Sequence, residues 1–588
     1  MEEPEFDETV DAIHHERPMR IICIGAGASG LCFAYKLQRS FRNFSLTIYE
    51  KNPGVSGTWY ENTYPGCACD IPAHNYTFSF EPKHDWSSVY ASSSEINDYF
   101  NGFSKKYCLD KYIKTRHQVS KACWSEEQGK WNVTIKDLIS GQILEDSCDI
   151  LIQAAGYLNN WAWPDIRGLD KFKGTMLHTA KWDNTVDLKG KQVGLIGNGP
   201  SGIQVLPAIQ PIVKTLIAFI RSPAWVLPTI GTAQRVYSRE EIEVFAEDSE
   251  KLTAHRKANE TMMNSIFSVY LENSRLQKML KARCINEMKQ ILQNDDLAEK
   301  FIPTYSVGCS RLTPSPGYLE TMRKDNVTAV HSAVTELTES GCICENGEEF
   351  PLDVLVCATG FDTSYRTRFP IIGPDGTSLE HDWANELKCY LGIAAAGFPN
   401  YCMSLGPYSP VGAGSVIPLI ETQIDHILKL VDRYQTERIH SFRPSPTAVS
   451  DFLAHTAHFM PRTVWSQTCR SPFKVPATGG VPSLWPGSTL HYMEALKDLR
   501  ADDWEIRYWG NRFAFLGNGL SQAEFDPSCD LGYYVQERDE SPWASRRKRR
   551  EVLTRSGTQT ERELHVPCRR DPEAIVLESK RECRAAEI

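Results

Sequence analysis

The chain has 588 residues, 41% of them hydrophobic and 23% charged, which is the composition of a folded protein with length for about three or four domains. Its formal net charge of −10 excludes the basic surface of a nucleic-acid-binding protein and disfavours binding to an anionic membrane. No apolar run reaches the roughly 18 residues of a membrane span, and the acidic residues 1–20 do not resemble a signal peptide.

The first predicted unit begins after residues 1–18, which we expect to be a flexible leader. Residues 19–25 are apolar and predict a buried parallel strand, and residues 29–39 have the pattern of a helix. A second strand is predicted at residues 45–49. The order strand, loop, helix, strand is typical of a mononucleotide-binding unit.

The loop between the first strand and the helix reads Gly-Ala-Gly-Ala-Ser-Gly, with its glycines at Gly25, Gly27 and Gly30. Gly25 permits a tight turn, Gly27 admits a pyrophosphate close to the backbone, and Gly30 lets helix and strand pack closely. Glu50 ends the second strand, where a carboxylate can accept hydrogen bonds from a ribose. Loop, helix N-terminus and acid together predict a dinucleotide site.

The same unit recurs later, with a strand at residues 192–197, a helix at residues 201–209 and a strand at residues 215–220. Two such units in one chain predict two dinucleotide domains. The second Gly-rich loop consists of Gly197, Asn198, Gly199, Pro200, Ser201 and Gly202.

Arg221, followed by Ser222, stands at the strand end where the first unit has Glu50. A guanidinium at this place can pair bidentately with a 2′-phosphate. We therefore predict NADP rather than NAD at the second loop. The alternative is a surface arginine in an ordinary ion pair.

Other regions differ in character. Residues 235–300 lack proline and are rich in Glu, Lys, Leu and Met, so they predict a helical insert. Residues 149–156 and 353–360 are apolar strands that end in small residues, which permit close approach of a ligand or of crossing backbone. Residues 536–588 are charge-dense and aromatic-poor, and predict a disordered tail.

Two stretches resemble a known family. The segment from Gly57 to Asp70, Gly-Thr-Trp-Tyr-Glu-Asn-Thr-Tyr-Pro-Gly-Cys-Ala-Cys-Asp, is similar to the flavin-side signature of the type I Baeyer–Villiger monooxygenases. Related segments extend over about residues 20–535, and Gly317-Tyr-Leu-Glu is similar in style to fungal members that act in secondary metabolism. The fingerprint of the family, F-x-G-x-x-x-H-x-x-x-W-[P/D], is matched just before the second Gly-rich loop by Phe172, Gly174, His178, Trp182 and Asp183.

The resemblance implies an α/β fold of two Rossmann-like dinucleotide-binding domains, for FAD and NADP, with the helical insert. The FAD domain would be discontinuous, over residues 19–180 and 335–535, and the NADP domain would cover residues 181–334. The implied reaction consumes NADPH and inserts one oxygen atom of O2 beside a ketone carbonyl, giving an ester or lactone. We expect a polyketide or terpenoid substrate from secondary metabolite biosynthesis, no nucleic-acid partner and no metal.

The resemblance also implies cofactor contacts. His178 and Trp182 would couple the linker to NADP binding rather than react. The expected FAD-binding residues are Gly25, Gly27, Gly30, Glu50, Thr58, Trp59, Tyr60, Glu61, Asp70, Ile71, Tyr76 and Val119. The expected NADP-binding residues are Ala68, Cys69, Gly197, Asn198, Gly199, Pro200, Ser201, Gly202, Ile203, Ile220, Arg221 and Ser222.

Arg311 matches the active-site arginine of the family, and Asp70 matches the carboxylate that positions it. Negative charge develops on oxygen during attack on a carbonyl, and a fixed planar guanidinium stabilises that charge better than a lysine. Two departures concern NADP. Ser310 stands where many members have a basic residue, and Pro472 replaces a Trp common in fungal relatives, so cofactor affinity or loop closure would differ.

Three alternative functions remain open. A nitrogen- or sulfur-oxidising flavin monooxygenase would usually have Tyr in place of Trp182. A disulfide reductase needs a redox dithiol, and Cys67 and Cys69 are better explained as part of a turn. An inactive NADP-sensing homologue is disfavoured by the presence of Asp70 and Arg311. The 18 cysteines lack the spacings of a disulfide framework, so we expect reduced, mostly buried thiols in a soluble cytoplasmic protein.

Overall fold

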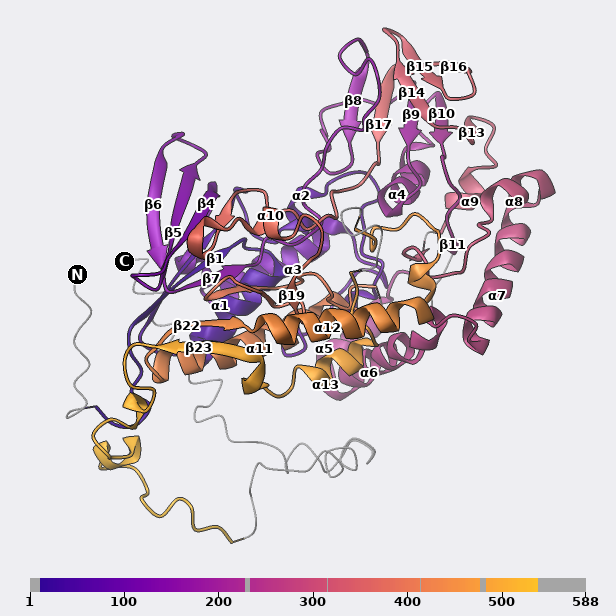
Figure 1. Cartoon of the computed structure of the whole chain (residues 1–588). Coiled ribbons are helices and arrows are strands. Elements are labelled where there is room, and N and C mark those ends of the chain that lie inside the picture. The colour runs from indigo at the N-terminus through magenta and orange to yellow at the C-terminus, as the bar shows by residue number, and fades with distance from the viewer. Residues whose placement is uncertain (1–10, 228–232, 315, 413, 476–482, 538–588) are drawn as a thin grey trace, which may run out of the picture.

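The computed structural model describes residues 11–227, 233–314, 316–412, 414–475 and 483–537. Most of the predicted leader and nearly all of the predicted tail therefore lie outside the described residues. Two separate sheets carry the two Gly-rich loops, and long helices lie along the first of them (Figure 1).

The first sheet has seven strands, with β1 near its centre, and contains the first Gly-rich loop. Five adjacent strands of this sheet, β21, β7, β1, β2 and β3, run parallel, and β20 and β19 extend it in antiparallel fashion. In chain order the strands are β1 (Met19–Ile24), β2 (Phe44–Tyr49), β3 (Ile113–Lys114), β7 (Ile150–Gln153), β19 (Cys389–Tyr390), β20 (Ala394–Ala395) and β21 (Tyr401–Met403).

Helices cover this sheet because its central strands are apolar on both faces. Ile21, Ile22 and Cys23 of β1 have no exposed surface, which a strand achieves only when both faces are packed. The helices α1 and α11 pack on each other, so the sequence between Gly25 and Ser40 meets a segment almost 400 residues later. The helices of this region are α1 (Ala28–Ser40), α2 (Thr58–Glu61), α3 (Ser93–Lys106), α10 (Leu379–Asp382), α11 (Val416–Thr436), α12 (Pro446–Phe459) and α13 (Thr489–Ala495).

The second sheet has five strands, all parallel, in the order β13-β10-β9-β17-β8. It extends past the predicted limits of the second domain, 181 and 334, because β8 and β17 pair side by side and β17 pairs with the central strand β9. Backbone pairing with neighbouring strands puts β8 and β17 in this sheet, although both lie outside the predicted limits in the sequence. The bounds are β8 (Thr175–His178), β9 (Gln192–Ile196), β10 (Thr215–Phe219), β13 (Val327–Val330) and β17 (Val354–Cys357), with α4 (Pro200–Ile209) and α9 (Tyr318–Thr321) beside them.

Smaller sheets surround the two large ones. They are a four-stranded sheet of order β18-β4-β5-β6, a three-stranded antiparallel sheet β14-β15-β16, and two separate strand pairs, β11 with β12 and β22 with β23. Their bounds are β4 (His117–Ser125), β5 (Lys130–Asp137), β6 (Ile143–Cys148), β11 (Val226–Leu227), β12 (Thr313–Pro314), β14 (Val334–Leu337), β15 (Gly341–Cys344), β16 (Glu349–Pro351), β18 (Ile371–Ile372), β22 (Ile439–Pro444) and β23 (Trp504–Tyr508).

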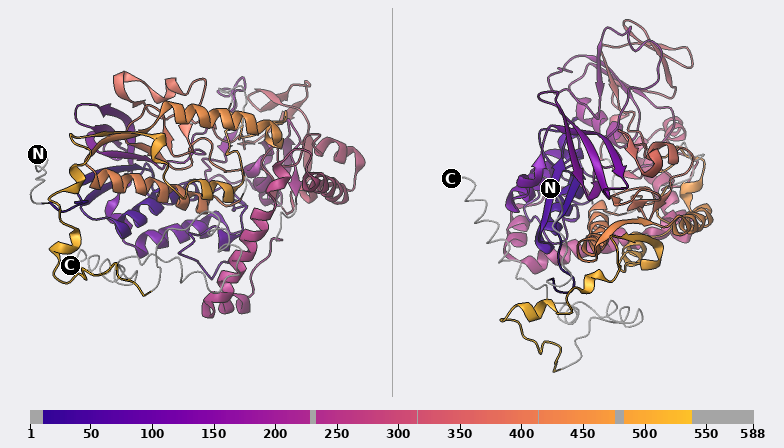
Figure 2. Two further views of the ribbon diagram at one scale, coloured as in Figure 1. Left: turned by 60° about the horizontal axis from the view of Figure 1, so that its bottom comes forward. Right: turned by 60° about the vertical axis from the view of Figure 1, so that its left-hand side comes forward.

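Four helices occupy the region of the predicted insert. Their starts are fixed by side-chain caps, which accept hydrogen bonds from the first free N–H groups of each helix: Ser238, Asp248, Ser274 and Asn294. Two of them, α7 and α8, lie at the opposite end of the molecule from the strands β4 to β6 (Figure 1; Figure 2, left). The bounds are α5 (Arg239–Glu247), α6 (Ser249–Ser265), α7 (Arg275–Leu292) and α8 (Asp295–Phe301).

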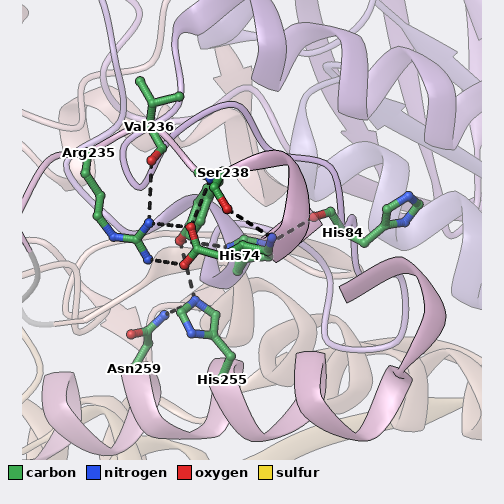
Figure 3. A network of polar contacts seen from close by, with 9 residues as sticks. His74, His84, Arg235, Val236, Ser238, His255 and Asn259 are labelled. Atoms are coloured by element: carbon green, nitrogen blue, oxygen red, sulfur yellow. Dashed lines mark hydrogen bonds and ion pairs between the residues drawn. The ribbon is translucent and has the colours of Figure 1, made fainter. Parts of the chain in front are cut away.

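A polar network fastens the insert to the first domain (Figure 3). His74 is almost fully buried, and its ring lies edge-on to that of His255 from α6, with the ring centroids 5.0 Å apart. Nδ1 of His74 lies 3.2 Å from the hydroxyl of Tyr237, and the amide of Asn259 lies 3.3 Å from Nε2 of His255. The insert is therefore packed against the segment that follows Asp70.

None of the helices in the described part of the chain is both long enough and apolar enough to cross a lipid bilayer.

Candidate active site

The first Gly-rich loop has no room for side chains at its ends. Gly25 has a φ of +101°, and a Cβ there would lie 2.8 Å from the carbonyl oxygen of Ala154. A Cβ on Gly30 would lie 2.1 Å from the carbonyl oxygen of Gly25. Gly27, the N-cap of α1, faces Gly57 so closely that a Cβ on Gly57 would be 3.2 Å from its Cα. This bare backbone at a helix N-terminus fits the pyrophosphate of a dinucleotide.

Glu50 is fixed beside this loop. The side chain is 4% exposed, and burial raises the pKa of its carboxyl group. One oxygen accepts a hydrogen bond of 2.8 Å from the backbone N–H of Ala26, and the other accepts one of 2.8 Å from Asn52. Each carboxylate oxygen has a second lone pair, so Glu50 can still accept from the hydroxyls of a ribose. The backbone of Glu50 also accepts from His117 of β4, which brings Val119 to this end of the sheet.

A cavity of about 820 Å³ lies between the first domain and the linker to the second. Trp59, Tyr60 and Glu61 of α2 line one side, and Trp161 and the fingerprint residue Trp182 line the other. Residues predicted to bind FAD and a residue predicted to couple the linker thus line the same cavity. The size and position of the cavity fit a bound cofactor.

Among the remaining predicted flavin-side residues, Tyr76 contacts a side chain that lines this cavity. The indole N–H of Trp59 donates to the hydroxyl of Tyr76 at 3.3 Å, and Tyr76 is buried. Ile71 is half-buried, whereas Thr58 is exposed at the start of α2. Glu61 is held by an ion pair of 2.7 Å with Lys51.

The second Gly-rich loop repeats the first at its ends and differs in its middle. A Cβ on Gly197, whose φ is +104°, would lie 2.5 Å from the carbonyl oxygen of Ala358, and one on Gly202 would lie 2.2 Å from that of Gly197. A Cβ on Gly199 would meet no described atom within 4 Å. The side facing away from the protein is therefore open at Gly199, where a phosphate would approach.

The carboxyl end of β10 lies beside this loop. Asn198 donates to the carbonyl of Ser222 at 2.9 Å, and Ile220 is buried. Arg221 is exposed, and among the described residues it has no carboxylate partner. Pro200, Ser201 and Ile203 begin α4, and Ser201 accepts from the hydroxyl of Thr179 in the linker at 3.2 Å. The ordinary ion pair that was the alternative for Arg221 is absent from the described part of the chain.

The segment 64–70 packs on α4 through a residue that sequence reasoning missed. Gln204 accepts from the hydroxyl of Tyr64 at 2.8 Å and donates to the carbonyl of Ala68 at 2.9 Å. Cys69 is buried and its backbone N–H donates to Ala91. Gln204 could have been predicted as a site residue from its position, because it lies two residues beyond the last glycine of the loop.

Asp70 ends this segment and meets Arg311. Nε of Arg311 donates to one carboxylate oxygen of Asp70 and Nη2 to the other, both at 2.7 Å. The attraction of Asp70 outweighs burial and raises the pKa of Arg311, so the guanidinium stays charged. The two residues are 241 positions apart, and the structure brings them together as predicted.

Aromatic side chains lie near this pair, and no sequence motif predicted them. Tyr157 and Tyr270 lie within the electrostatic reach of Arg311; burial raises the pKa of each phenol and the nearby guanidinium opposes that rise. Tyr270 stacks on Trp465, with centroids 5.1 Å apart and ring planes inclined by 27°. Phe267 approaches Trp465 from the same segment as Tyr270. We call Tyr157, Phe267, Tyr270 and Trp465 the aromatic wall.

The fingerprint residues hold the linker in place. His178 ends β8, lies 3.0 Å from the hydroxyl of Thr359 and stacks on Trp161. Burial lowers the pKa of His178 to about 4, so the ring is neutral near pH 7. Phe172 covers Gly174, where a Cβ would lie 2.4 Å from the phenyl ring. Asp183 is exposed and accepts from Thr185.

The prediction that the cysteines are reduced is wrong for Cys309 and Cys469, which form a disulfide across 160 residues, and for Cys108, which is also disulfide-bonded. Spacing in sequence cannot reveal a pair that the fold brings together from such distant segments. Cys67 and Cys69 are unbridged and buried, and burial raises the pKa of both thiols, which disfavours the reactive thiolate that a disulfide reductase needs.

The sequence has recognisable relatives. Residues 23–92 match the NAD(P)-binding Rossmann-like domain family. The chain is 38% identical over 534 residues to the FAD-binding monooxygenase tazF of Aspergillus terreus, covering 88% of this chain and 95% of that protein. It is 30% identical over 531 residues to a Baeyer-Villiger monooxygenase of Streptomyces coelicolor, covering 88% of this chain and 97% of that protein.

The fold also matches solved structures. Cyclohexanone monooxygenase from Rhodococcus sp. Phi1, bound to NADP+, aligns with a TM-score of 0.74 at 26% identity, covering 84% of this chain and 100% of that chain. An oxidised steroid monooxygenase bound to NADP aligns with a TM-score of 0.72 at 25% identity, again over 84% of this chain. The predicted α/β fold with two dinucleotide-binding domains is confirmed.

Proposed function

Because the chain belongs to the FAD-binding monooxygenases of the Baeyer–Villiger type, we propose that it converts a bulky ketone into an ester or lactone with one oxygen atom of O2. The family relationship confirms the predicted cofactors, FAD and NADPH. Bound FAD supplies the redox chemistry, since it accepts a hydride from NADPH and passes electrons to O2. The residues of the chain would bind the two cofactors, orient the reacting groups and stabilise the developing charge.

The first Gly-rich loop and Glu50 would hold FAD. Gly25, Gly27 and Gly30 leave bare backbone at the N-terminus of α1, and Glu50 offers a carboxylate fixed by two backbone donors. The second loop would hold NADPH, with Arg221 on its 2′-phosphate. The free position of Arg221 supports this assignment.

Arg311 would stabilise the negative charge that develops on oxygen when the ketone carbonyl is attacked. Asp70 uses two of the five N–H groups of the guanidinium, and three are left for other acceptors. The pair fixes the plane of the guanidinium before the reaction, so little reorganisation is needed. The Asp70–Arg311 pair, which lies within electrostatic reach of Tyr157 and Tyr270, is the observation that carries the proposal.

Segment 64–70 would couple NADPH binding to the position of Arg311. One end of the segment is held by Gln204 of α4, and its other end is Asp70. A shift of α4 on cofactor binding would therefore reach the guanidinium through one short stretch of backbone.

The aromatic wall supports a large apolar substrate. Tyr157 and Phe267 are partly exposed and pack on a cluster that contains the buried Tyr270 and Trp465, so the region near the Asp70–Arg311 pair is strongly apolar and aromatic. We therefore propose a polyketide or terpenoid ketone from the biosynthesis of a secondary metabolite, as the family style of the sequence also implies. We place the enzyme in the cytoplasm, which maintains NADPH.

Substitution of Arg311 tests this function. Arg311→Ala should still oxidise NADPH and reduce its flavin but should lose ester formation by at least about 100-fold, the loss typical of a removed charge-stabilising donor. Arg311→Lys should recover only a small part, because it lacks the planar fork. Ester yield by mass spectrometry and NADPH absorbance measure the two steps separately.

The result that would refute the assignment is normal ester formation by Arg311→Ala. A wild type that oxidises a thioether or an amine but no ketone would instead support the nitrogen- or sulfur-oxidising alternative, which Trp182 disfavours.

A further inference from the structure

The loop that carries Arg311 is covalently tied to a distant segment. Cys309 lies two residues before Arg311, and its disulfide partner Cys469 follows Trp465 of the aromatic wall by four residues. The Cα atoms of the two cysteines are 6.2 Å apart, and both side chains are buried.

The backbone beside the disulfide packs directly on the aromatic wall. Gly308 has a φ of +89°, and a Cβ there would lie 3.0 Å from the ring of Tyr270 and 3.7 Å from Val464. Tyr270 in turn stacks on Trp465. Wall, loop and disulfide therefore form one continuous packed unit around Arg311.

Hydrogen bonds also connect the segments around the Cys309–Cys469 disulfide. The backbone N–H of Ser306 donates to the side chain of Gln467 at 3.0 Å, and the amide of Gln467 donates to Glu272 at 3.1 Å. The ammonium of Lys474 donates to the carbonyl of Cys469 at 3.1 Å and also to that of Gln467. Burial lowers the pKa of Lys474. The segment 467–474 is thus joined to the Arg311 loop by the Ser306–Gln467 hydrogen bond and the Cys309–Cys469 disulfide, while the Lys474 bonds brace the segment internally.

We propose that the Cys309–Cys469 disulfide is a positioning crosslink, which holds Arg311 against the aromatic wall so that NADPH consumption stays coupled to oxygen transfer. This inference rests on the proposed function. Only two peptide units separate Cys309 from Arg311, so a fixed sulfur restricts the guanidinium closely. A disulfide also restricts the alternative conformations of both segments.

The bond forms by a balanced two-electron oxidation. The two thiols lose two electrons and two protons to hydrogen peroxide, one S–S bond forms, the O–O bond breaks, and two waters leave. Hydrogen peroxide is the product when a flavin monooxygenase oxidises NADPH with O2 and transfers no oxygen to a substrate. A phosphine reductant with water reverses the bond and yields two thiols and a phosphine oxide.

The test compares Cys309→Ser, Cys469→Ser and the double variant with the wild type and with Cys529→Ser, which removes an exposed free cysteine. Each holoenzyme is assayed for FAD content, for the KM of NADPH, and for ester formed per NADPH oxidised. We expect unchanged FAD content, an NADPH KM within about twofold, and a fall of at least threefold in ester per NADPH. The two single variants and the double variant should match, because each removes the same bond.

Reduction provides a second measurement that does not depend on folding of a variant. Treatment with a phosphine should lower the ester formed per NADPH oxidised by the wild type to the ratio of the variants, and hydrogen peroxide should restore it. The same treatment should not change the ratio of the variants. Mass spectrometry of a non-reduced digest should show the peptides of Cys309 and Cys469 joined.

Absence of the joined peptide after peroxide treatment would overturn the proposal, as would a joined wild type whose variants couple equally well. A wild type that forms no ester would contradict the proposed function and with it the positioning role, whereas ester formation with unaltered coupling in all variants contradicts the crosslink role alone.

Discussion

Two arginines of the candidate site have opposite surroundings, and these surroundings assign them different tasks. Arg311 is half-buried and held by both oxygens of Asp70. Arg221 is exposed at the end of β10, with no carboxylate partner among the described residues. A paired guanidinium is fixed for charge stabilisation, whereas an unpaired one is available to a ligand.

Removal of the Arg221 side chain should therefore weaken the binding of NADPH and leave the binding of NADH unchanged. A charge-assisted bidentate contact is worth about 1.5–3 kcal/mol, so Arg221→Ala should raise the KM for NADPH by about 10- to 100-fold. Steady-state kinetics with both cofactors measure the difference. Equal use of NADH and NADPH by the wild type, unchanged in the variant, would show that Arg221 does not read the 2′-phosphate.

At the scale of elements, α6 is clamped to the segment after Asp70 by one side chain. Arg256 donates to the backbone carbonyls of His74, Phe78 and Ser79 and to the hydroxyl of Thr77, at distances between 3.0 and 3.2 Å. It lies on the same helix as His255 and Asn259, which join the network of Figure 3. The insert thus braces the stretch that leads from Asp70 to the buried Tyr76.

Loss of this clamp should destabilise the fold. Arg256→Met keeps the apolar stem but removes four hydrogen bonds, so the free energy of unfolding should fall by about 2 kcal/mol. Urea denaturation of the FAD-loaded enzyme measures it. The neighbouring exposed Lys257→Ala is the control, and an equal effect of the two substitutions would count against the clamp.

At the scale of the whole molecule, three buried histidines lie in three different regions. They are His74 after Asp70, His178 in the fingerprint and His426 in α11, and burial lowers the pKa of each from 6.5 to about 4. Between these values the unfolded chain binds protons that the folded protein does not bind. Their contribution to stability is complete above pH 6.5 and is lost as the pH falls towards 4.

The free energy of unfolding should therefore decrease as the pH is lowered from 6.5 to 4. Substitution of one of these histidines removes its share of the proton uptake, so His426→Gln should show a shallower decrease than the wild type over this range. Urea titrations at pH 7, 6, 5 and 4.5 give the two slopes. Identical slopes would contradict the assignment of a buried neutral ring to His426.

Local patterns explain how much of the site could be predicted. The glycines of both loops, Glu50 and Arg221 follow from the short chain path of a strand–helix–strand unit, which fixes their places within about 30 residues. The Asp70–Arg311 pair could be predicted only from the resemblance, since 241 residues separate its members.

Contacts between distant segments explain what could not be predicted. Tyr270 and Trp465 meet through tertiary packing alone, and neither lies in a motif. The Cys309–Cys469 bond and the pairing of β8 with β17 arise in the same way. Side-chain patterns report which residues are buried, but they do not report which buried segments meet.

The origin of the inserted oxygen atom distinguishes a Baeyer–Villiger monooxygenase from an enzyme that only oxidises NADPH. The FAD-loaded enzyme should be incubated with NADPH, a panel of polycyclic and terpenoid ketones, and ¹⁸O₂ in ordinary water, and the products analysed by mass spectrometry. A Baeyer–Villiger monooxygenase should yield an ester or lactone that carries one ¹⁸O atom for each NADPH oxidised. NADPH consumption that yields only hydrogen peroxide with every ketone, or an ester without ¹⁸O, would contradict the proposed function.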